Sequence, residues 1–214
     1  MSFDPTKRLI VGDTIIEQPP AAEDRREQIF FHAARLFVEK GIGNTSMADI
    51  AKAVGITKAG LYYFVESKED LLYTLMRWGM EVLERDVVEP ARQIDDPETR
   101  LAAIIRNHVY NIGRVQGPQG NPITILVDEP GQLGPERQAD IDARKRAYFE
   151  FVRGTLAALK REGKLADVDL NVATFSILGM IIWMGRWRRP GGPLELDAIA
   201  DHITRLSLGG VLRK

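Results

Sequence analysis

The sequence TSMADIAKAVGITKAGLYYFVESK, from Thr45 to Lys68, carries start and stop signals for two short helices. Ser46 and Asp49 have the spacing of a capping box. Gly55 predicts the end of the first helix, because glycine reaches a positive φ without steric cost, and Thr57 can cap the next helix almost at once. The apolar residues of the first helix recur at helical spacing: Met47, Ile50, Ala51 and Val54. Two helices joined by so tight a turn indicate a helix-turn-helix.

The second helix has a surface that suits a DNA major groove. Its small residues allow close backbone approach, its lysine can reach a phosphate or a guanine edge, and its hydroxyls can bind phosphates. The residues concerned are Thr57, Lys58, Ala59, Gly60, Tyr62 and Tyr63. The alternative is a purely structural helical hairpin, in which the two tyrosines are core aromatics.

The run GITKAGLYYFVESKEDLL, which begins at Gly55, resembles the signature of TetR-family transcriptional regulators. The resemblance implies DNA contacts for the backbone-phosphate positions Thr45 and Ser46, the groove positions Thr57, Lys58, Gly60 and Tyr62, and the phosphate positions Tyr63 and Lys68. Phe64 departs from the pattern, since the family often has a hydrogen-bonding His or Tyr there and Phe cannot donate to a phosphate.

Composition places the chain among soluble globular proteins. It has 214 residues, of which 44% are apolar and 28% charged, and a net charge of −1. Acidic and basic residues nearly balance between Ala21 and Asp70, so DNA affinity must come from where the cations lie. The absence of cysteine excludes disulfides and thiolate metal sites, and with no secretory signal or long apolar span the expected location is cytoplasmic, with no membrane partner.

The expected fold is all-α, with an N-terminal three-helix helix-turn-helix domain followed by a larger helical ligand-binding and dimerisation domain. Residues 1–20 form a flexible arm whose Lys7 and Arg8 either touch DNA or are solvated, residues 21–66 the DNA-binding domain, and residues 67–214 the effector-binding and dimerisation domain. The expected helices are Glu23 to Lys40, the two of the helix-turn-helix, a connecting helix from Ser67 to Pro90, the stripe from Leu101 to Ile112, and Pro135 to Glu162. Ile123 to Glu129 fits helix or strand by pattern alone, and its all-helical context favours helix.

Asn171 to Met184 is apolar on nearly all sides, and the stretch is shorter than the roughly twenty residues that span a bilayer. Either it is the core helix of a monomer, or it is buried on one side within its subunit and on the other against a second copy. In the resembled family such a helix and its neighbour form a four-helix interface about a two-fold axis. The predicted interface residues are Phe151, Phe175, Leu178 and Ile182.

A second unusual stretch, WMGRWRRPGGPLELDAIADHITRL, begins at Trp183. Its arginines are explained either by the dipole at a helix C-terminus or by an anion site, where guanidinium groups bind phosphate and tryptophans stack on a flat ring. The stretch resembles the C-terminal region of TetR-type repressors that sense acyl-CoA thioesters in fatty-acid and steroid-ring breakdown, although Arg188 replaces an aromatic residue often found there. The predicted effector-binding residues are Trp183, Arg186, Trp187 and Arg189.

The sequence therefore predicts a dimeric repressor that binds a palindromic double-stranded DNA operator and is released by a small molecule, with an acyl-CoA thioester as the leading effector. Two alternatives remain: a TetR-like regulator of another hydrophobic ligand, in efflux or stress response, and a dimeric ligand-binding protein with weak DNA binding. Catalysis is not expected, because the sequence has no HExxH, GxSxG, GxGxxG or P-loop motif. The three histidines, His32, His108 and His202, lack metal-ligand spacing, so neither a metal nor a cofactor is expected.

Overall fold

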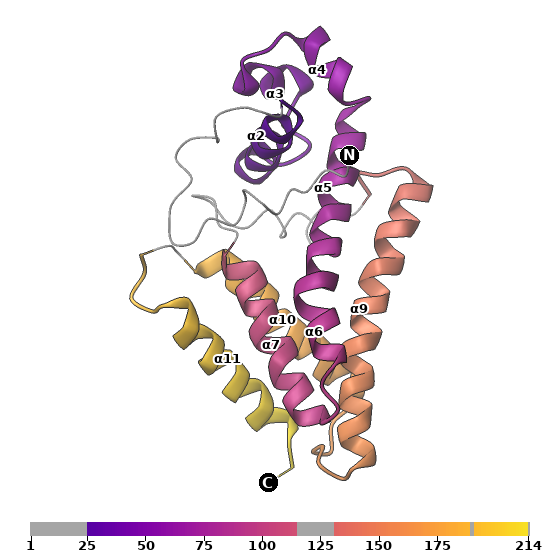
Figure 1. Cartoon of the computed structure of the whole chain (residues 1–214), viewed down its shortest axis with the longest axis vertical. Coiled ribbons are helices and arrows are strands. Elements are labelled where there is room, and N and C mark those ends of the chain that lie inside the picture. The colour runs from indigo at the N-terminus through magenta and orange to yellow at the C-terminus, as the bar shows by residue number, and fades with distance from the viewer. Residues whose placement is uncertain (1–24, 115–130, 189–190, 214) are drawn as a thin grey trace. The chain divides into compact units, whose positions relative to one another are not determined.

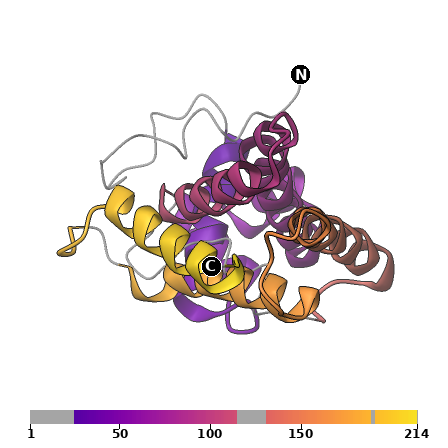
Figure 2. The same cartoon turned by 90° about the horizontal axis from the view of Figure 1, so that it is seen from below.

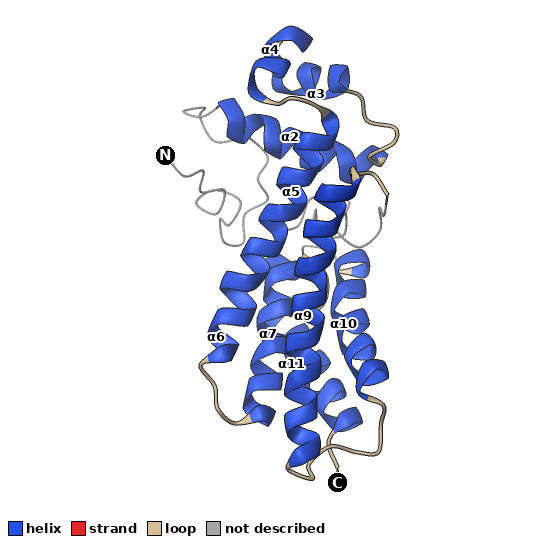
Figure 3. Ribbon diagram, turned by 90° about the vertical axis from the view of Figure 1, so that its right-hand side faces the viewer, coloured by secondary structure: helices blue, strands red, loops and turns tan. Residues whose placement is uncertain are grey.

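The computed structural model describes residues 25–114, 131–188 and 191–213 (Figure 1). Within these ranges every secondary-structure element is a helix, as Figure 3 shows. The one β-type pairing in them is an isolated bridge between Leu165 and Leu212. The all-α class is confirmed. The predicted N-terminal arm and the ambiguous run Ile123 to Glu129 lie outside the described residues.

The chain forms two compact units. The first comprises the described residues up to Gly79 together with 131–141, and the second comprises Met80–Arg114 together with the described residues from Asp142 onward. Two helices, α5 (Lys68–Leu83) and α9 (Pro135–Arg161), each begin in the first unit and end in the second. The units thus divide the chain within helices, whereas the sequence analysis placed the boundary before Ser67.

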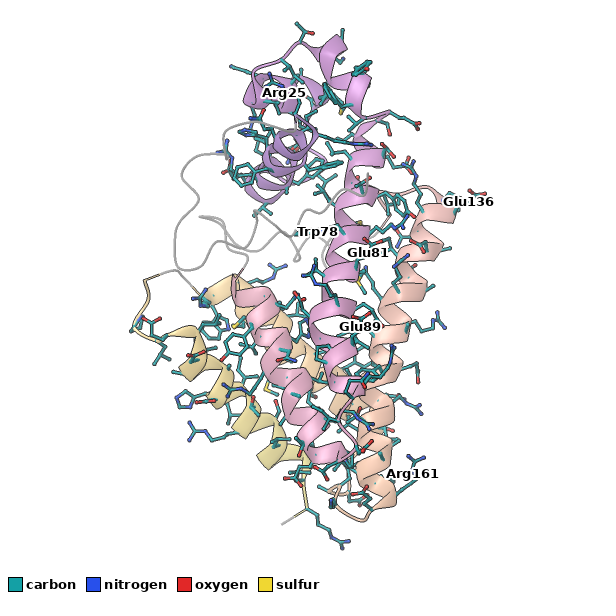
Figure 4. The ribbon with its side chains drawn as sticks, viewed as in Figure 1. Arg25, Trp78, Glu81, Glu89, Glu136 and Arg161 are labelled. Atoms are coloured by element: carbon teal, nitrogen blue, oxygen red, sulfur yellow. The ribbon has the colours of Figure 1, made fainter. Side chains whose placement is uncertain are left out.

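The first unit contains the three predicted helices of the helix-turn-helix domain: α2 (Arg25–Lys40, its first residue labelled in Figure 4), α3 (Met47–Val54) and α4 (Lys58–Phe64). Ser46 and Asp49 form the predicted capping box, and Gly55 ends α3 with a φ of 75°. Apolar residues from each helix and from the turn between the first two are fully buried, among them Ile29, Ile42, Ile50 and Leu61. Burial of these side chains, at about 1.5–3 kcal/mol each, holds the short helices together.

The predicted connecting helix changes its winding near its end. After α5, residues Glu84–Val88 form a π-helical turn, and α6 (Glu89–Arg92) completes the helix. The backbone N–H of Glu89 reaches the carbonyl of Glu84, five residues back. Pro90 follows directly and has no N–H to donate, so the regular hydrogen-bond ladder cannot continue through it.

The second unit is built around α7 (Pro97–Arg114), which packs against both α10 (Leu170–Trp187) and α11 (Leu196–Val211), as Figure 2 shows. The α7 and α11 helices run antiparallel, with ion pairing between Arg106 and Asp201 and a hydrogen bond from the hydroxyl of Tyr110 to Asp197. A Cβ on Gly113 would overlap the side chain of Leu196, so glycine permits this close approach.

The α10 helix is longer than the apolar run from which it was predicted. At 18 residues it is long and apolar enough to cross a membrane by those two criteria alone, and the core helix of a soluble protein meets the same criteria. The expectation of no membrane span was made from the shorter run Asn171 to Met184, and the full helix does not contradict it, because a core helix has the same length and composition. Its packing against α7 and α11 shows how one face is buried within the subunit.

Candidate DNA interface and effector-binding domain

The α4 helix is held by one buried residue and displays the others. Thr57 caps it by accepting a hydrogen bond from the backbone N–H of Gly60 at 3.0 Å. Leu61 is fully buried, while Tyr63 is 86% exposed and Tyr62 is also exposed. The ammonium group of the exposed Lys58 lies 6.0 Å from the centroid of the Tyr62 ring. The helix therefore presents to solvent a cation and two phenol hydroxyls, which are groups that can bind phosphates and base edges.

The two residues predicted to lie near backbone phosphates differ in where their side chains point. Thr45 is 1% exposed, and its hydroxyl lies 2.9 Å from the carbonyl of Gly41, inside the domain. Ser46 is exposed, and its hydroxyl donates to the carboxylate of Asp49 at 2.6 Å. Hydrogen bonds from the Ser46 side chain and backbone lower the pKa of the Asp49 carboxyl. Of the two hydroxyls, only that of Ser46 is on the surface.

Lys68 binds the turn that connects α2 and α3. Its half-buried ammonium group donates to the carbonyl of Ile42 at 2.9 Å and to that of Thr45 at 3.1 Å. These carbonyls lie in the turn between α2 and α3, where the carbonyl of Ile42 also accepts from the backbone N–H of Thr45 at 3.3 Å. An ammonium group has three N–H donors, and two are therefore engaged within the unit.

The residues after Lys68 hold the first turn of α9, also within the first unit. The carboxylate of Glu69 accepts from the backbone N–H of Gly134 at 2.9 Å. The guanidinium of Arg137 donates to Asp70 at 3.0 Å and lies 5.1 Å from the centroid of the Tyr73 ring. Both partners of the Arg137–Asp70 pair are partly buried. Solvent and salt therefore screen this ion pair less than they screen an ion pair on the surface.

The predicted effector residues at the end of α10 point outward. Trp183 is 60% exposed, Trp187 is also exposed, and the guanidinium of Arg186 lies 5.1 Å from the centroid of the Trp183 ring. Arg189 lies outside the described residues. Arg188, which the sequence analysis noted only as a departure from the family pattern, instead points inward and donates from Nη1 to the carbonyl of Gly113 at 2.8 Å.

These tryptophans continue an apolar stripe along α10. The stripe, hereafter the α10 stripe, comprises Val172, Phe175, Met180, Trp183 and Trp187, all exposed. The ring of Phe149 on α9 lies 4.7 Å from that of Phe175, so the stripe is continuous with a neighbouring helix. Of the predicted dimer residues, Phe175 lies on this stripe at 66% exposed, whereas Leu178 is 9% exposed and faces the subunit core. Phe151 and Ile182 are partly exposed.

The core of the second unit contains a buried polar pair that the sequence analysis did not identify. Nδ1 of His108 on α7 lies 2.9 Å from the hydroxyl of Tyr148 on α9, and the two rings meet edge to face. His108 is 3% exposed. Burial lowers the pKa of the His108 imidazole to about 4 and raises that of the Tyr148 phenol, so both groups are neutral near pH 7.

Comparison with known proteins gives two family matches. A model described as bacterial regulatory proteins, tetR family, matches residues 29–74. A model described as tetracyclin repressor-like, C-terminal domain, matches residues 95–211, more than half of the chain. The chain belongs to the TetR family. The helix-turn-helix is therefore the DNA-binding part of a transcriptional regulator.

Individual TetR-family relatives match over nearly their full length. The HTH-type transcriptional repressor KstR2 of Rhodococcus jostii (strain RHA1) is 29% identical over 202 residues, which are 90% of this chain and 97% of the relative. The structure of AibR in complex with isovaleryl coenzyme A and operator DNA is 35% identical, with a TM-score of 0.78, over 86% of this chain and 97% of that one. PfmR from Thermus thermophilus is 30% identical, with a TM-score of 0.74, over 85% and 97%. KstR2 and PfmR are named as transcriptional regulators, in agreement with the expectation of a regulator rather than an enzyme.

Within the described part of this TetR-family chain, no cluster of three or more His, Asp or Glu side chains could hold a metal ion. The described side chains include groups suited to recognition: a cation and hydroxyls on α4, a polar pair inside the second unit, and an exposed apolar stripe. His108 and Tyr148 were missed because each fits the apolar spacing of its helix, and only the tertiary fold brings the two rings together.

Replacing Lys68 by Met should lower the stability of this regulator by about 1.5–3 kcal/mol, because two carbonyls lose a charged donor. The measurement is urea unfolding followed by circular dichroism. Lys52→Met, at an exposed position of α3, is the matched control and should have a smaller effect. Equal losses for the two variants would show that the carbonyl contacts of Lys68 do not stabilise the fold.

His108 should make stability fall as the pH is lowered from about 6.5 towards 4. Its pKa is lowered from 6.5 to about 4 in the folded chain, so over this range the unfolded chain binds the extra proton. The contribution, up to about 3 kcal/mol, is fully present above pH 6.5 and is lost through this window. Urea unfolding at several pH values should show a flatter profile for His108→Gln, while the exposed variant His202→Gln should retain the wild-type profile.

Proposed function

We propose that this TetR-family protein is a dimeric repressor that binds a palindromic operator and is released by an acyl-CoA thioester. The observation that carries the DNA-binding role is the capped α4 helix, which buries Leu61 and exposes Lys58, Tyr62 and Tyr63. The similarity to KstR2, a named repressor, supports repression. The similarity to AibR, solved with isovaleryl coenzyme A and operator DNA, supports the class of effector.

In the proposed complex, α4 enters the major groove and the flanking residues bind phosphates. Lys58 reaches a phosphate or a guanine edge, and the hydroxyl of Tyr63, on the most exposed aromatic ring of α4, donates to a phosphate. Ser46 can contribute its exposed hydroxyl, whereas Thr45 can contribute only its backbone, because its side chain bonds inside the domain. The remaining donor of Lys68 is available to a phosphate.

The proposed dimer is formed through the α10 stripe. Exposed aromatic rings in a continuous row are characteristic of protein interfaces, and a two-fold axis would pair each stripe with its copy. We therefore assign Trp183 and Trp187 to the dimer interface rather than to a ligand site within one subunit. Phe175 remains in the proposed interface, and Leu178, which packs inside the subunit, does not.

The proposed route from effector to DNA follows helices that both units share. The residue Tyr148, in the core of the second unit, lies on the same helix as Arg137, which bonds to the start of α5 in the first unit. At the start of α5, Asp70 accepts from Arg137 and Glu69 accepts from the backbone N–H of Gly134, next to the first turn of α9. The preceding residue, Lys68, donates to the turn between α2 and α3. An effector that repositions α9 would therefore act on the residues that brace the DNA-reading helices.

The DNA-binding role is tested by fluorescence anisotropy with the DNA that flanks the gene of this protein. Lys58→Ala and Tyr63→Ala should each weaken binding about tenfold or more, because each removes a contact to phosphate or base. Arg146→Ala, at an exposed position of α9, should leave the affinity unchanged. Isovaleryl-CoA should release the DNA, whereas free coenzyme A and isovalerate should not.

Three outcomes of this assay would overturn different parts of the proposal. Binding unaffected by Lys58→Ala and Tyr63→Ala would show that α4 is not the reading surface. If no CoA thioester releases the protein from DNA but another hydrophobic ligand does, the result would support an efflux or stress regulator. Absence of any DNA binding would support a dimeric ligand-binding protein.

Replacing Phe175 by Asp should convert the dimer to monomers, because the substitution places two carboxylates in the proposed apolar interface. Sedimentation velocity at micromolar concentration measures the change. Leu206→Asp, at an exposed leucine of α11 that lies outside the α10 stripe, is the matched control and should remain dimeric. A dimeric Phe175→Asp variant would show that the subunits associate through another surface.

A further inference from the structure

The buried side of α7 is aliphatic except at two positions. Leu101, Ile104, Ile105, Val109 and Ile112 are all buried, and His108 and Asn111 interrupt them at 3% and 7% exposed. Because His108 and Asn111 are three residues apart on a helix, their side chains are neighbours on the same face. A polar group at such depth is retained where a hydrogen bond satisfies it, so the partners of each group decide what the pair can do.

The hydrogen bond between His108 and Tyr148 leaves one donor over. If the tyrosine hydroxyl donates to Nδ1, the imidazole carries its proton on Nε2 and can donate from there. If Nδ1 donates instead, the tyrosine hydroxyl keeps its own hydrogen for another acceptor. In either arrangement the pair is neutral and offers one further hydrogen.

Asn111 adds an acceptor. Its side-chain carbonyl Oδ1 is buried, and in the described structure it has no hydrogen-bond partner. Leaving a buried carbonyl unpaired destabilises the fold about as much as losing a hydrogen bond, so apolar side chains of similar size would be more stable at this position. Oδ1 of Asn111 can therefore accept a hydrogen bond that none of the described residues supplies.

We infer that His108, Tyr148 and Asn111 form the polar end of the effector site and recognise a neutral group that has both a carbonyl oxygen and an N–H. The inference rests on the proposed function and identifies the part of the acyl-CoA that is read. The thioester carbonyl accepts the spare hydrogen of the His108–Tyr148 pair. The first amide N–H of the pantetheine arm, separated from the thioester carbonyl by the sulfur and two methylenes, donates to Oδ1 of Asn111.

The same groups discriminate against the free acid. A carboxylate has no hydrogen to give to Asn111, and its charge would lie beside a carbonyl oxygen among aliphatic side chains. The His108–Tyr148 pair is neutral near pH 7 and does not compensate that charge. Arg188 donates to the carbonyl of Gly113 at the end of α7, and its positive charge could attract a carboxylate. The test therefore includes the free acid.

The test uses the full-length dimer and the variant Asn111→Leu, with Asn107→Leu, a partly exposed asparagine of the same helix, as the matched control. Thermal unfolding without ligand comes first. Asn111→Leu should melt at a higher temperature than the wild type, because it removes the unpaired carbonyl. A lower melting temperature, as expected for an asparagine that stabilises the fold, would overturn the inference.

Calorimetric titration with isovaleryl-CoA, octanoyl-CoA, free coenzyme A and isovalerate comes second. Asn111→Leu should bind the thioesters at least tenfold more weakly than the wild type and Asn107→Leu, and isovalerate should bind none of the three proteins. Equal thioester affinity in Asn111→Leu and wild type, or tight binding of isovalerate, would overturn the inference.

The two proposals fail in distinguishable ways. If neither thioester releases the wild-type protein from DNA and neither binds in the titration, the proposal of an acyl-CoA effector is wrong. The inference about Asn111 is then wrong as well, because it rests on that proposal. If the wild type binds a thioester and releases DNA, but Asn111→Leu does the same at equal concentration, the proposed function stands and the assignment of Asn111 is wrong.

Discussion

The ammonium group of Lys68 gives the turn between α2 and α3 two hydrogen bonds from a charged donor. The carbonyls of Ile42 and Thr45 lie outside any helix, and Lys68 donates to both. The next two residues, Glu69 and Asp70, bond to the first turn of α9. Three consecutive side chains at the start of α5 therefore connect the DNA-reading helices to a helix that continues into the second unit.

The features that sequence predicted correctly are those whose partners lie within one turn of the chain. The capping box of Ser46 and Asp49, the left-handed Gly55 and the cap at Thr57 each need only residues three or four positions away. The partners of Lys68 and Asp70 lie 23 to 67 positions away, so local pattern could not identify them. The resemblance to the TetR family implied the fold class and the reading helix, but it assigned Lys68 to phosphate alone.

Uniform apolarity also limited the prediction for α10. A helix with apolar residues on nearly every side gives no periodic signal that distinguishes the subunit core from an outer face. Phe175 and Leu178 are only three residues apart, yet one is 66% and the other 9% exposed. The tryptophans suggested a ligand site because aromatic rings stack on flat ligands, and the fold places them on the exposed α10 stripe. Only the packing of α7 and α11 decides which face is inside.

The two units keep their polar groups for opposite purposes. In the first unit, the Thr45 hydroxyl and two of the three donors of Lys68 bond to backbone carbonyls, which helps to hold the reading helices in place. In the second unit, Oδ1 of Asn111 has no partner among the described residues and lies on a buried face that is aliphatic except for this residue and His108, which lowers stability. Reading helices that are held in place lose less entropy on binding DNA, and in the proposed effector site the ligand would supply the missing partner of Asn111. A ligand can shift the equilibrium between a DNA-binding and a released conformation only by as much as its affinities for the two conformations differ. A partner that only the ligand supplies would provide such a difference.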